Sequence, residues 1–185
     1  MESLTGKLLI AMPSIGDVRF KRSVILVCAH NVDYAMGLVL NKPMDGLALP
    51  DLLEQLDIEA QIELPKSAIL DGGPVGNDRG FVLHSDDYQC DGATLDVTGE
   101  VCLTATRDVL LAMASDAPPR ASTLALGYSG WGPGQLELEL KENAWLIGHA
   151  DEGILFGDAH PEKWERALDI IGIPSGRLQG MSGRA

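Results

Sequence analysis

Short apolar segments, each followed by a turn, restrict the fold of this chain more than any other feature of its sequence. Residues 7–12 are largely apolar and stop at Pro13, and residues 23–29 are largely apolar and rich in β-branched side chains. Apolar runs of this length between turns predict buried β-strands. Residues 37–40 continue the pattern after a break at residues 31–33, so we expect the second and third segments to pair as a hairpin.

The remaining pattern alternates between strands and helices. Further strands are expected at residues 68–70, 80–84, 123–126 and 145–147, with one more within residues 95–103, and helices at residues 50–57, 104–115 and 161–171. In the last helix, Trp164, Leu168 and Ile171 share one face. Residues 135–141 alternate as a strand would, but their Gln, Leu, Glu and Lys side chains favour a helix, and a helix is our prediction.

These elements predict an α/β (α+β-like) fold in which helices pack on a mixed β-sheet. The hairpin near the start of the chain argues against a purely parallel sheet. A length of 185 residues suits one large core and is short for two, so we expect a single domain over residues 1–185. The extreme termini are expected to be frayed.

The formal charge of −13 argues against a surface that binds duplex DNA, because such surfaces need clustered Lys and Arg. No apolar run approaches the roughly 20 residues of a membrane-spanning helix, and the N-terminus lacks the features of a signal peptide. The three cysteines, Cys28, Cys90 and Cys102, are odd in number and form no CxxC pair. We therefore expect a cytoplasmic protein that binds neither membranes nor, directly, nucleic acid.

Three loops follow the carboxyl ends of predicted strands and contain the candidate ligand-binding residues. They begin at Asn41, at Gly72-Gly73-Pro74 and at residue 127, and the third loop extends to residue 134. Ligands of α/β sheets bind beyond the carboxyl ends of strands, and glycine lets the backbone approach a ligand closely. A helix that begins at Gln135 would also present free N–H groups to the third loop. The alternative is that these glycines only make tight turns, so a shared pocket is a hypothesis.

Arg79 and His84 flank the strand after the second loop. Arg79 could bind an anion, but an ion pair with Asp71 or Asp78 is the interpretation that we favour. His84 is a candidate for proton transfer. The four histidines have no HxxxH or HExxH spacing, and neither a P-loop nor a dinucleotide-binding GxGxxG is present, so no metal and no cofactor are expected.

The third loop and the helix after it supply four more candidates. Tyr128 and Gln135 could bind a ligand, Trp131 could form a pocket wall or core, and Glu137 could transfer protons or be solvated. Residues 127–131 are similar to the nucleophile elbow of serine hydrolases, but Trp131 stands where the second glycine belongs. Ser129 is therefore not expected to be a nucleophile.

Several long motifs are spread over nearly the whole chain. They are residues 4–13, 37–43, 72–75 and 78–84, then Gly-Tyr-Ser-Gly-Trp-Gly-Pro-Gly-Gln-Leu-Glu-x-Glu-Leu over residues 127–140, then Asn143, Trp145, residues 155–156 and Trp164. In these motifs the chain resembles the YqgE/AlgH family of bacterial proteins. The resemblance implies a single α/β domain with a mixed sheet in the bacterial cytosol, a helix after the Gly-Trp-Gly loop, and no particular reaction. Because one member is linked to the regulation of alginate production, members are often labelled transcriptional regulators.

Three functional hypotheses follow. The first is a non-enzymatic regulatory or accessory protein that binds a small ligand or a protein partner at the surface formed by the loops at Asn41, at Gly72-Gly73 and at residues 127–134. The second is an enzyme that acts on a small polar or phosphorylated substrate at the same loops, with His84 or Glu137 moving protons. The third is a transcriptional regulator, for which the charge of −13 disfavours direct DNA binding.

Overall fold

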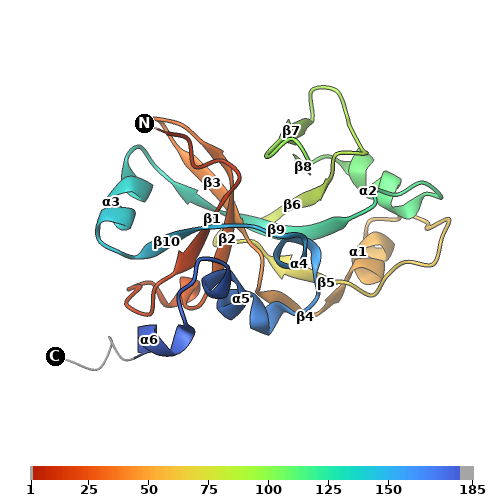
Figure 1. The fold of residues 1–185 in the computed structure, drawn as a ribbon. Coiled ribbons are helices and arrows are strands. Elements are labelled where there is room, and N and C mark those ends of the chain that lie inside the picture. Colours follow the sequence, from red (N-terminus) through yellow and green to blue (C-terminus); the bar gives the residue numbers. More distant parts are fainter. Residues whose placement is uncertain (1, 180–185) are drawn as a thin grey trace.

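Ten β-strands of the described residues form one curled sheet, on which the helices pack (Figure 1). In a computed structural model that describes residues 2–179, the strands are β1 (Lys7–Ala11), β2 (Val24–His30), β3 (Ala35–Val39), β4 (Pro43–Ala48), β5 (Ala68–Asp71), β6 (Val75–Ser85), β7 (Thr94–Asp96), β8 (Val101–Thr104), β9 (Ser122–Trp131) and β10 (Trp145–His149). Along the main path the order is β10-β1-β2-β3-β9-β6-β8-β7, while β5 pairs with β4 and β9. The β5–β9 pair is parallel and its neighbours are antiparallel, which confirms the expected mixed sheet packed by helices.

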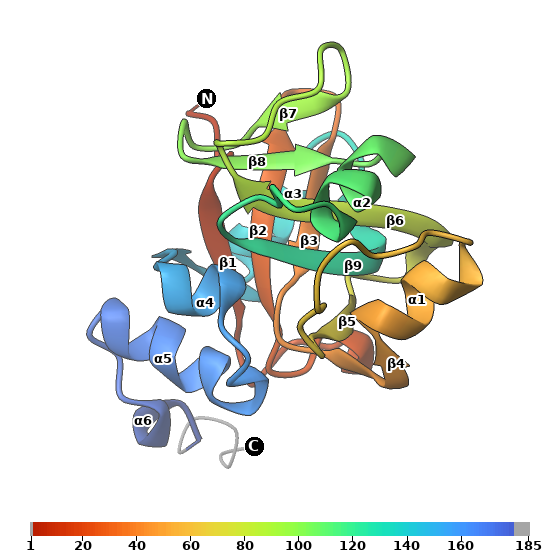
Figure 2. The same cartoon turned by 90° about the vertical axis from the view of Figure 1, so that its right-hand side faces the viewer.

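Six α-helices cover the sheet in the part of the chain that the structure describes. They are α1 (Leu49–Gln55), α2 (Arg107–Ala114), α3 (Gln135–Lys141), α4 (Glu152–Phe156), α5 (Lys163–Ile170) and α6 (Ser175–Gln179), with 3-10 turns at Val18–Phe20 and His160–Glu162. Figure 1 places α3 at one end of the molecule and α1 and α2 at the other, and Figure 2 shows α4, α5 and α6 grouped along one side. The helix predicted for residues 135–141 is confirmed.

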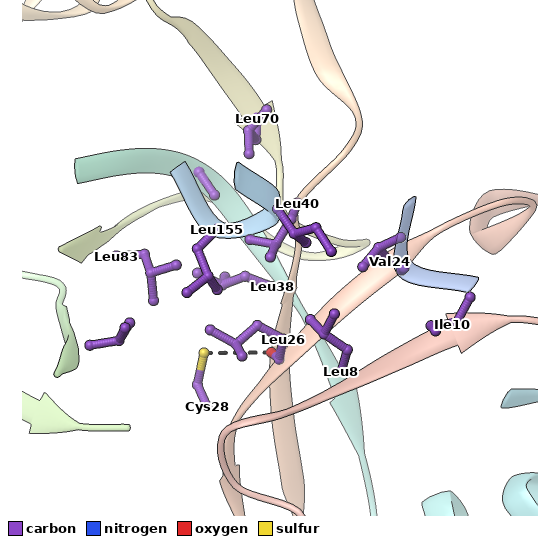
Figure 3. Close-up of a cluster of buried hydrophobic side chains, with 14 of the residues drawn as sticks. Leu8, Ile10, Val24, Leu26, Cys28, Leu38, Leu40, Leu70, Leu83 and Leu155 are labelled. Atoms are coloured by element: carbon purple, nitrogen blue, oxygen red, sulfur yellow. Dashed lines mark hydrogen bonds between the residues drawn. The ribbon is translucent and has the colours of Figure 1, made fainter. Parts of the chain in front are cut away.

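The apolar runs of β1 and β2 are continuous because both faces of these strands are buried. Leu8 and Leu26 belong to a core cluster that extends to Leu83 of β6 and to Leu155 of α4 (Figure 3). The alternate residues of the same strands, such as Leu9, pack on the opposite face with residues of α3. A third cluster lies beneath α1 and α2. The sheet is therefore the middle layer between separate groups of helices.

Several boundaries differ from the predictions. The segment 95–103 contains the hairpin of β7 and β8 rather than one strand. Strand β9 continues to Trp131, because its last residues pair with β3, so the third predicted loop shrinks to residues 132–134. Strand β4 and helices α4 and α6 were not predicted, since each has at most six residues and too few periodic positions to give a signal. The expected frayed termini concern residue 1 and residues 180–185, which lie outside the described residues.

Helix α5 is fixed to the strands through two buried donors. The indole of Trp164 donates to the carbonyl of Ala11 at 2.9 Å, and the ammonium of Lys163 donates to the carbonyl of Leu40 at 2.9 Å. Only 2% of Lys163 is exposed. Burial lowers the pKa of this lysine to about 8, against the opposing attraction of Asp158. A buried ammonium with a carbonyl partner stabilises a fold less than a well-packed apolar side chain can.

The pKa of Lys163 predicts a specific pH dependence of stability. Since the folded-state pKa of about 8 lies below the ordinary 10.5, the charged lysine opposes folding below about pH 8, and this opposition is lost as the pH rises toward 10.5. The full effect is on the order of 3 kcal/mol. We expect Lys163→Met to be at least as stable as the wild type at neutral pH. As the pH rises from 8 to 10, the free energy of unfolding of the wild type should increase relative to that of Lys163→Met. Urea unfolding of both proteins, and of a control variant at an exposed lysine, Lys66→Met, measures this difference. If the free energies of unfolding of the wild type and Lys163→Met change with pH in parallel, the prediction is contradicted.

Candidate functional site

A close backbone contact lies at the centre of the sheet, where two of the predicted loops meet. One edge of β9 pairs first with β5, at Ala125 and Leu126, and then with β3, from Ser129 onward. Gly72 and Gly73 fill the gap between these two partners. The N–H of Gly72 donates to the carbonyl of Leu126 at 2.9 Å, and the carbonyl of Gly72 accepts from the N–H of Val39 at 3.0 Å. The loop at Gly72 is therefore hydrogen-bonded to β3 and β9 at once.

Only glycine fits at positions 72 and 73. A Cβ at Gly72 would overlap the carbonyl oxygen of Gly127, and a Cβ at Gly73, which has a φ of +149°, would overlap the backbone of Tyr128. Positive φ is strained for other residues. The neighbouring Ser129 is fully buried and its hydroxyl donates to the carbonyl of Gly72 at 3.3 Å. These glycines serve close packing of backbone, and Ser129 is not placed to attack a substrate.

Asn41 has a structural position at the end of the β2–β3 hairpin. Its Oδ1 accepts from the N–H of Val24 at 3.0 Å, and its Nδ2 donates to the carbonyl of Arg22 at 2.8 Å. Glu137 contacts His30 at the other end of β2. Val24 and His30 are six residues apart on an extended strand, which is roughly 20 Å. Asn41 and Glu137 lie at opposite ends of the same strand, so these two predicted residues do not share one site.

Three of the predicted residues do come together. Arg79, Tyr128 and Trp131 line an open cavity of about 490 Å³, together with Tyr34, Met36, Val75 and Phe81. We call it the Arg79 cavity. Pro74 and Gly73 face a neighbouring cavity, whose other lining residues include Lys42 and Asn77. The Arg79 cavity thus joins residues of the second and third predicted loops, and the neighbouring cavity joins residues of the first and second.

The floor of the Arg79 cavity is aromatic. The Phe81 and Tyr128 rings meet edge to face with centroids 5.7 Å apart, and the Arg79 guanidinium lies 5.5 Å from the centroid of Phe81. The favoured ion pair of Arg79 with Asp71 or Asp78 is wrong: among the described residues Arg79 has no ion-pair partner. Asp71 instead accepts from the N–H of Gly73 at 3.2 Å. The guanidinium is exposed and free to bind an anion.

Glu139 ties the third loop to the helix that follows it. Its Oε2 accepts from the indole N–H of Trp131 at 2.9 Å and from that of Trp145 at 2.7 Å. Its Oε1 accepts from the side-chain amide of Gln135 at 3.1 Å, and Gln135 in turn accepts from the N–H of Gly132 at 3.0 Å. Gln135 therefore holds the turn and is not directed at a ligand. Trp131 serves as both core and cavity wall.

Glu137 is engaged by a buried histidine. His30 Nε2 lies 2.7 Å from a carboxylate oxygen of Glu137, and His30 Nδ1 accepts from the N–H of Leu4 at 3.0 Å. Accepting at Nδ1 assigns the proton of a neutral ring to Nε2, which then donates to Glu137. This hydrogen bond lowers the pKa of Glu137. The pair attaches the N-terminal segment and α3 to the end of β2.

His84 lies away from the Arg79 cavity and is fully buried. Its Nδ1 is 2.8 Å from the carbonyl oxygen of Ser85, so Nδ1 carries the proton, and Nε2 is 2.8 Å from the hydroxyl of Thr104, from which it accepts. That hydroxyl also contacts Thr94 at 2.8 Å. The prediction that His84 lies at the ligand surface is wrong, because successive side chains of a strand alternate between the two faces, and the alternation that turns Phe81 toward the cavity puts His84 on the opposite face, beside Thr104.

Residues 2–179 show neither the geometry of a metal site nor that of a membrane-spanning helix. No group of three or more His, Cys, Asp and Glu side chains could hold a metal there, and no helix of that part of the chain is long and apolar enough to cross a membrane. The three cysteines are free thiols. Burial raises the pKa of Cys28 to about 12, so this thiol stays protonated and behaves as a core side chain.

The AlgH-like family model matches residues 8–176 of the chain. The chain belongs to the AlgH-like family. A UPF0301 protein from Caulobacter vibrioides is 53% identical over 185 residues, which are 100% of this chain and 95% of that protein. UPF0301 protein blr1492 from Bradyrhizobium diazoefficiens is 50% identical over 98% of this chain and 88% of its own length. The resemblance inferred from the motifs is confirmed.

Solved structures agree with this assignment. The solution structure of the AlgH protein from Pseudomonas aeruginosa matches with a TM-score of 0.77 and 40% identity, over 99% of this chain and 96% of that chain. The crystal structure of protein DIP2367 from Corynebacterium diphtheriae matches with a TM-score of 0.70 at 19% identity, over 91% of this chain and 87% of that chain, and shows the common fold alone.

Sequence reasoning gave no site role to His30 and Phe81, and it considered Glu139 only beside Glu137, as a possible acid–base carboxylate or a solvated or capping residue. Phe81 was predicted as part of a strand and His30 as a core or surface histidine, and only their positions in the folded sheet reveal their contacts. Glu139 carried a signal, because it stands four residues after Gln135, on the same face of α3. A search for buried donors that need an acceptor would have singled it out.

The shared carboxylate of Glu139 predicts a large effect on stability. Glu139→Ala removes the acceptor of two indole N–H groups and leaves both without a partner, so the free energy of unfolding should fall by at least about 2 kcal/mol. Glu142→Ala, an exposed change just after the same helix, should stay within about 0.5 kcal/mol of the wild type. Urea unfolding followed by tryptophan fluorescence compares the three proteins. Equal midpoints for the two variants would show that the Glu139 network contributes nothing.

Proposed function

We propose that this AlgH-like protein is a non-enzymatic regulatory or accessory protein that binds a small anionic molecule in the Arg79 cavity. The Arg79 guanidinium carries this proposal. It lies in an open cavity without an ion-pair partner among the described residues, on a chain whose formal charge is −13. An acidic chain offers many carboxylates to an arginine, so an arginine that pairs with none of them in a cavity is suited to an external anion.

The rest of the cavity indicates what else the ligand contains. Tyr34, Phe81 and Tyr128 supply flat apolar surface beside the guanidinium. Small-molecule sites combine such aromatic walls with a few polar groups that set orientation. A phosphate or carboxylate group attached to a ring or a short apolar body satisfies both parts, as in a nucleotide or a phosphorylated metabolite. An enzyme at this surface has less support, because His84 and Glu137 lie outside the cavity.

The proposal extends to the compartment and to the mode of regulation. We place the protein in the bacterial cytoplasm, where three free thiols are stable. Any effect on transcription would act through a bound ligand or a protein partner, since a charge of −13 repels the phosphates of DNA.

Direct DNA binding is tested by a retardation assay at low salt, where phosphate contacts are strongest. We expect no retardation of duplex DNA by the purified protein at micromolar concentrations. A salt-sensitive shift would overturn the indirect mode of action.

Ligand binding is tested by thermal shift with inorganic phosphate, citrate, AMP and GMP as probes. A probe at 100 times its Kd stabilises the native state by about 2.7 kcal/mol, which for this size raises Tm by roughly 5–10 °C. Arg79→Gln should weaken binding about tenfold or more, because it removes the charge that holds the anion. Arg177→Gln, a change of an exposed arginine in α6, is the matched control and should bind as the wild type does. No stabilisation by any probe, or equal loss in both variants, would redirect the search to a protein partner.

A further inference from the structure

A cavity lined mainly by apolar side chains lies between two helices and the sheet. Helices α1 and α2 both pack on β6 and β9 (Figure 2), and a cavity of about 240 Å³ opens where they meet these strands. Its apolar lining comes from all four elements and includes Leu52, Leu56, Val82, Val109, Leu110 and Leu124. Sites for drug-sized ligands measure roughly 300–1,000 Å³, so this cavity suits a smaller molecule with an apolar body.

Gly80 leaves open space in the wall of this cavity, which we call the Gly80 cavity. Successive side chains of a strand alternate between its two faces. Arg79 and Phe81 therefore line the Arg79 cavity, whereas Gly80 and Val82 line this one. A Cβ at Gly80 would meet only Leu126, at 3.8 Å, which is an ordinary contact, and Gly80 does not have a positive φ. Neither the backbone nor the packing requires glycine there, and a larger side chain would extend into the cavity.

Two side chains of opposite charge, Arg107 and Asp78, also line the Gly80 cavity. Arg107 begins α2, and one of its N–H groups donates to the carbonyl of Leu56, just after α1, at 2.9 Å. A guanidinium has five N–H donors, so this bond positions Arg107 and leaves donors for a ligand. Among the described residues, Arg107 and Asp78 form no ion pair with each other or with any other side chain. The cavity thus presents a separate cation and anion beside an apolar surface.

We infer that the Gly80 cavity binds a free apolar α-amino acid, such as leucine or phenylalanine. The ligand carboxylate accepts from Arg107, the ligand ammonium donates to Asp78, and the ligand side chain lies on Val82 and Leu124. An alkyl carboxylate fits less well because Asp78 repels it, and an alkyl amine fits less well because Arg107 repels it. A molecule with both charges next to an apolar body uses every group of the lining. This site does not depend on the anion proposed for the Arg79 cavity.

Isothermal titration calorimetry of the full chain with L-leucine, L-phenylalanine and three analogues tests the ligand class. 4-Methylpentanoate lacks the ammonium of leucine, 3-methylbutylamine lacks its carboxylate, and L-alanine lacks most of its apolar body. We expect saturable binding of both amino acids and binding of each analogue that is about tenfold weaker or more, because each loses one charged contact or the apolar contact. If neither amino acid binds at millimolar concentration, or if 4-methylpentanoate binds as tightly as leucine, the inference is overturned.

Gly80→Val tests the location. The added side chain occupies the space of the ligand, so the affinity for leucine should fall by about tenfold or more. Gly16→Val is the matched control, because a Cβ at Gly16 meets nothing within 4 Å and Gly16 does not line the cavity. It should bind leucine as the wild type does. Circular dichroism checks that both variants fold, and unchanged leucine binding by a folded Gly80→Val overturns the inference.

Arg107→Gln and Asp78→Asn test the two charges. Each should weaken leucine binding by about tenfold or more, whereas Arg177→Gln, at an exposed arginine of α6, should not. Asp78→Asn should also bring the affinity for 4-methylpentanoate close to that for leucine, because the same carboxylate holds the ammonium and repels the analogue. A merely structural role of Asp78 would weaken both ligands alike. That result, or leucine binding that neither variant weakens, would show that the two charges do not recognise an amino acid.

Discussion

The contact of Gly72 and Gly73 with the backbone of Gly127 and Tyr128 is the constraint on which the rest of this fold depends. It lets one edge of β9 pair with β5 and then with β3, so that a single strand joins both halves of the sheet. The helices on either side pack on the faces of the sheet whose two halves this junction connects. The Arg79 cavity lies directly beside it, because Tyr128 belongs to the junction and to the cavity wall.

Most of the conspicuous family motif maintains structure rather than chemistry. Trp131 and Gln135 both donate to Glu139, Asn41 closes a hairpin, and Ser129 is buried beneath Gly72. Arg79 differs from all of these because no carboxylate of the described chain pairs with its guanidinium. In a protein with so many carboxylates, that contrast separates a binding group from residues that hold the fold.

Local patterns predicted much of the fold and little of the site. Continuous apolar runs in β1 and β2 and the spacing of Trp164 with Leu168 are local signals, and both led to correct elements. The separation of Asn41 from Glu137 depends on the length of β2 and on which end each loop joins, and the burial of His84 depends on which face of β6 is covered. Both features depend on tertiary structure, which local sequence patterns do not reveal. Glycines were read as ligand contacts because close approach to a ligand and close approach to another strand require the same residue.

The double role of Glu139 has a consequence for how such sequences diverge. One carboxylate accepts from two indoles that are fourteen positions apart in the chain. If either tryptophan is replaced by a residue that has no donor, the Glu139 carboxylate loses a hydrogen bond. Positions 131, 139 and 145 are thus expected to be inherited as one unit. Substitutions among relatives should appear there in combination, whereas the neighbouring positions of α3 drift independently.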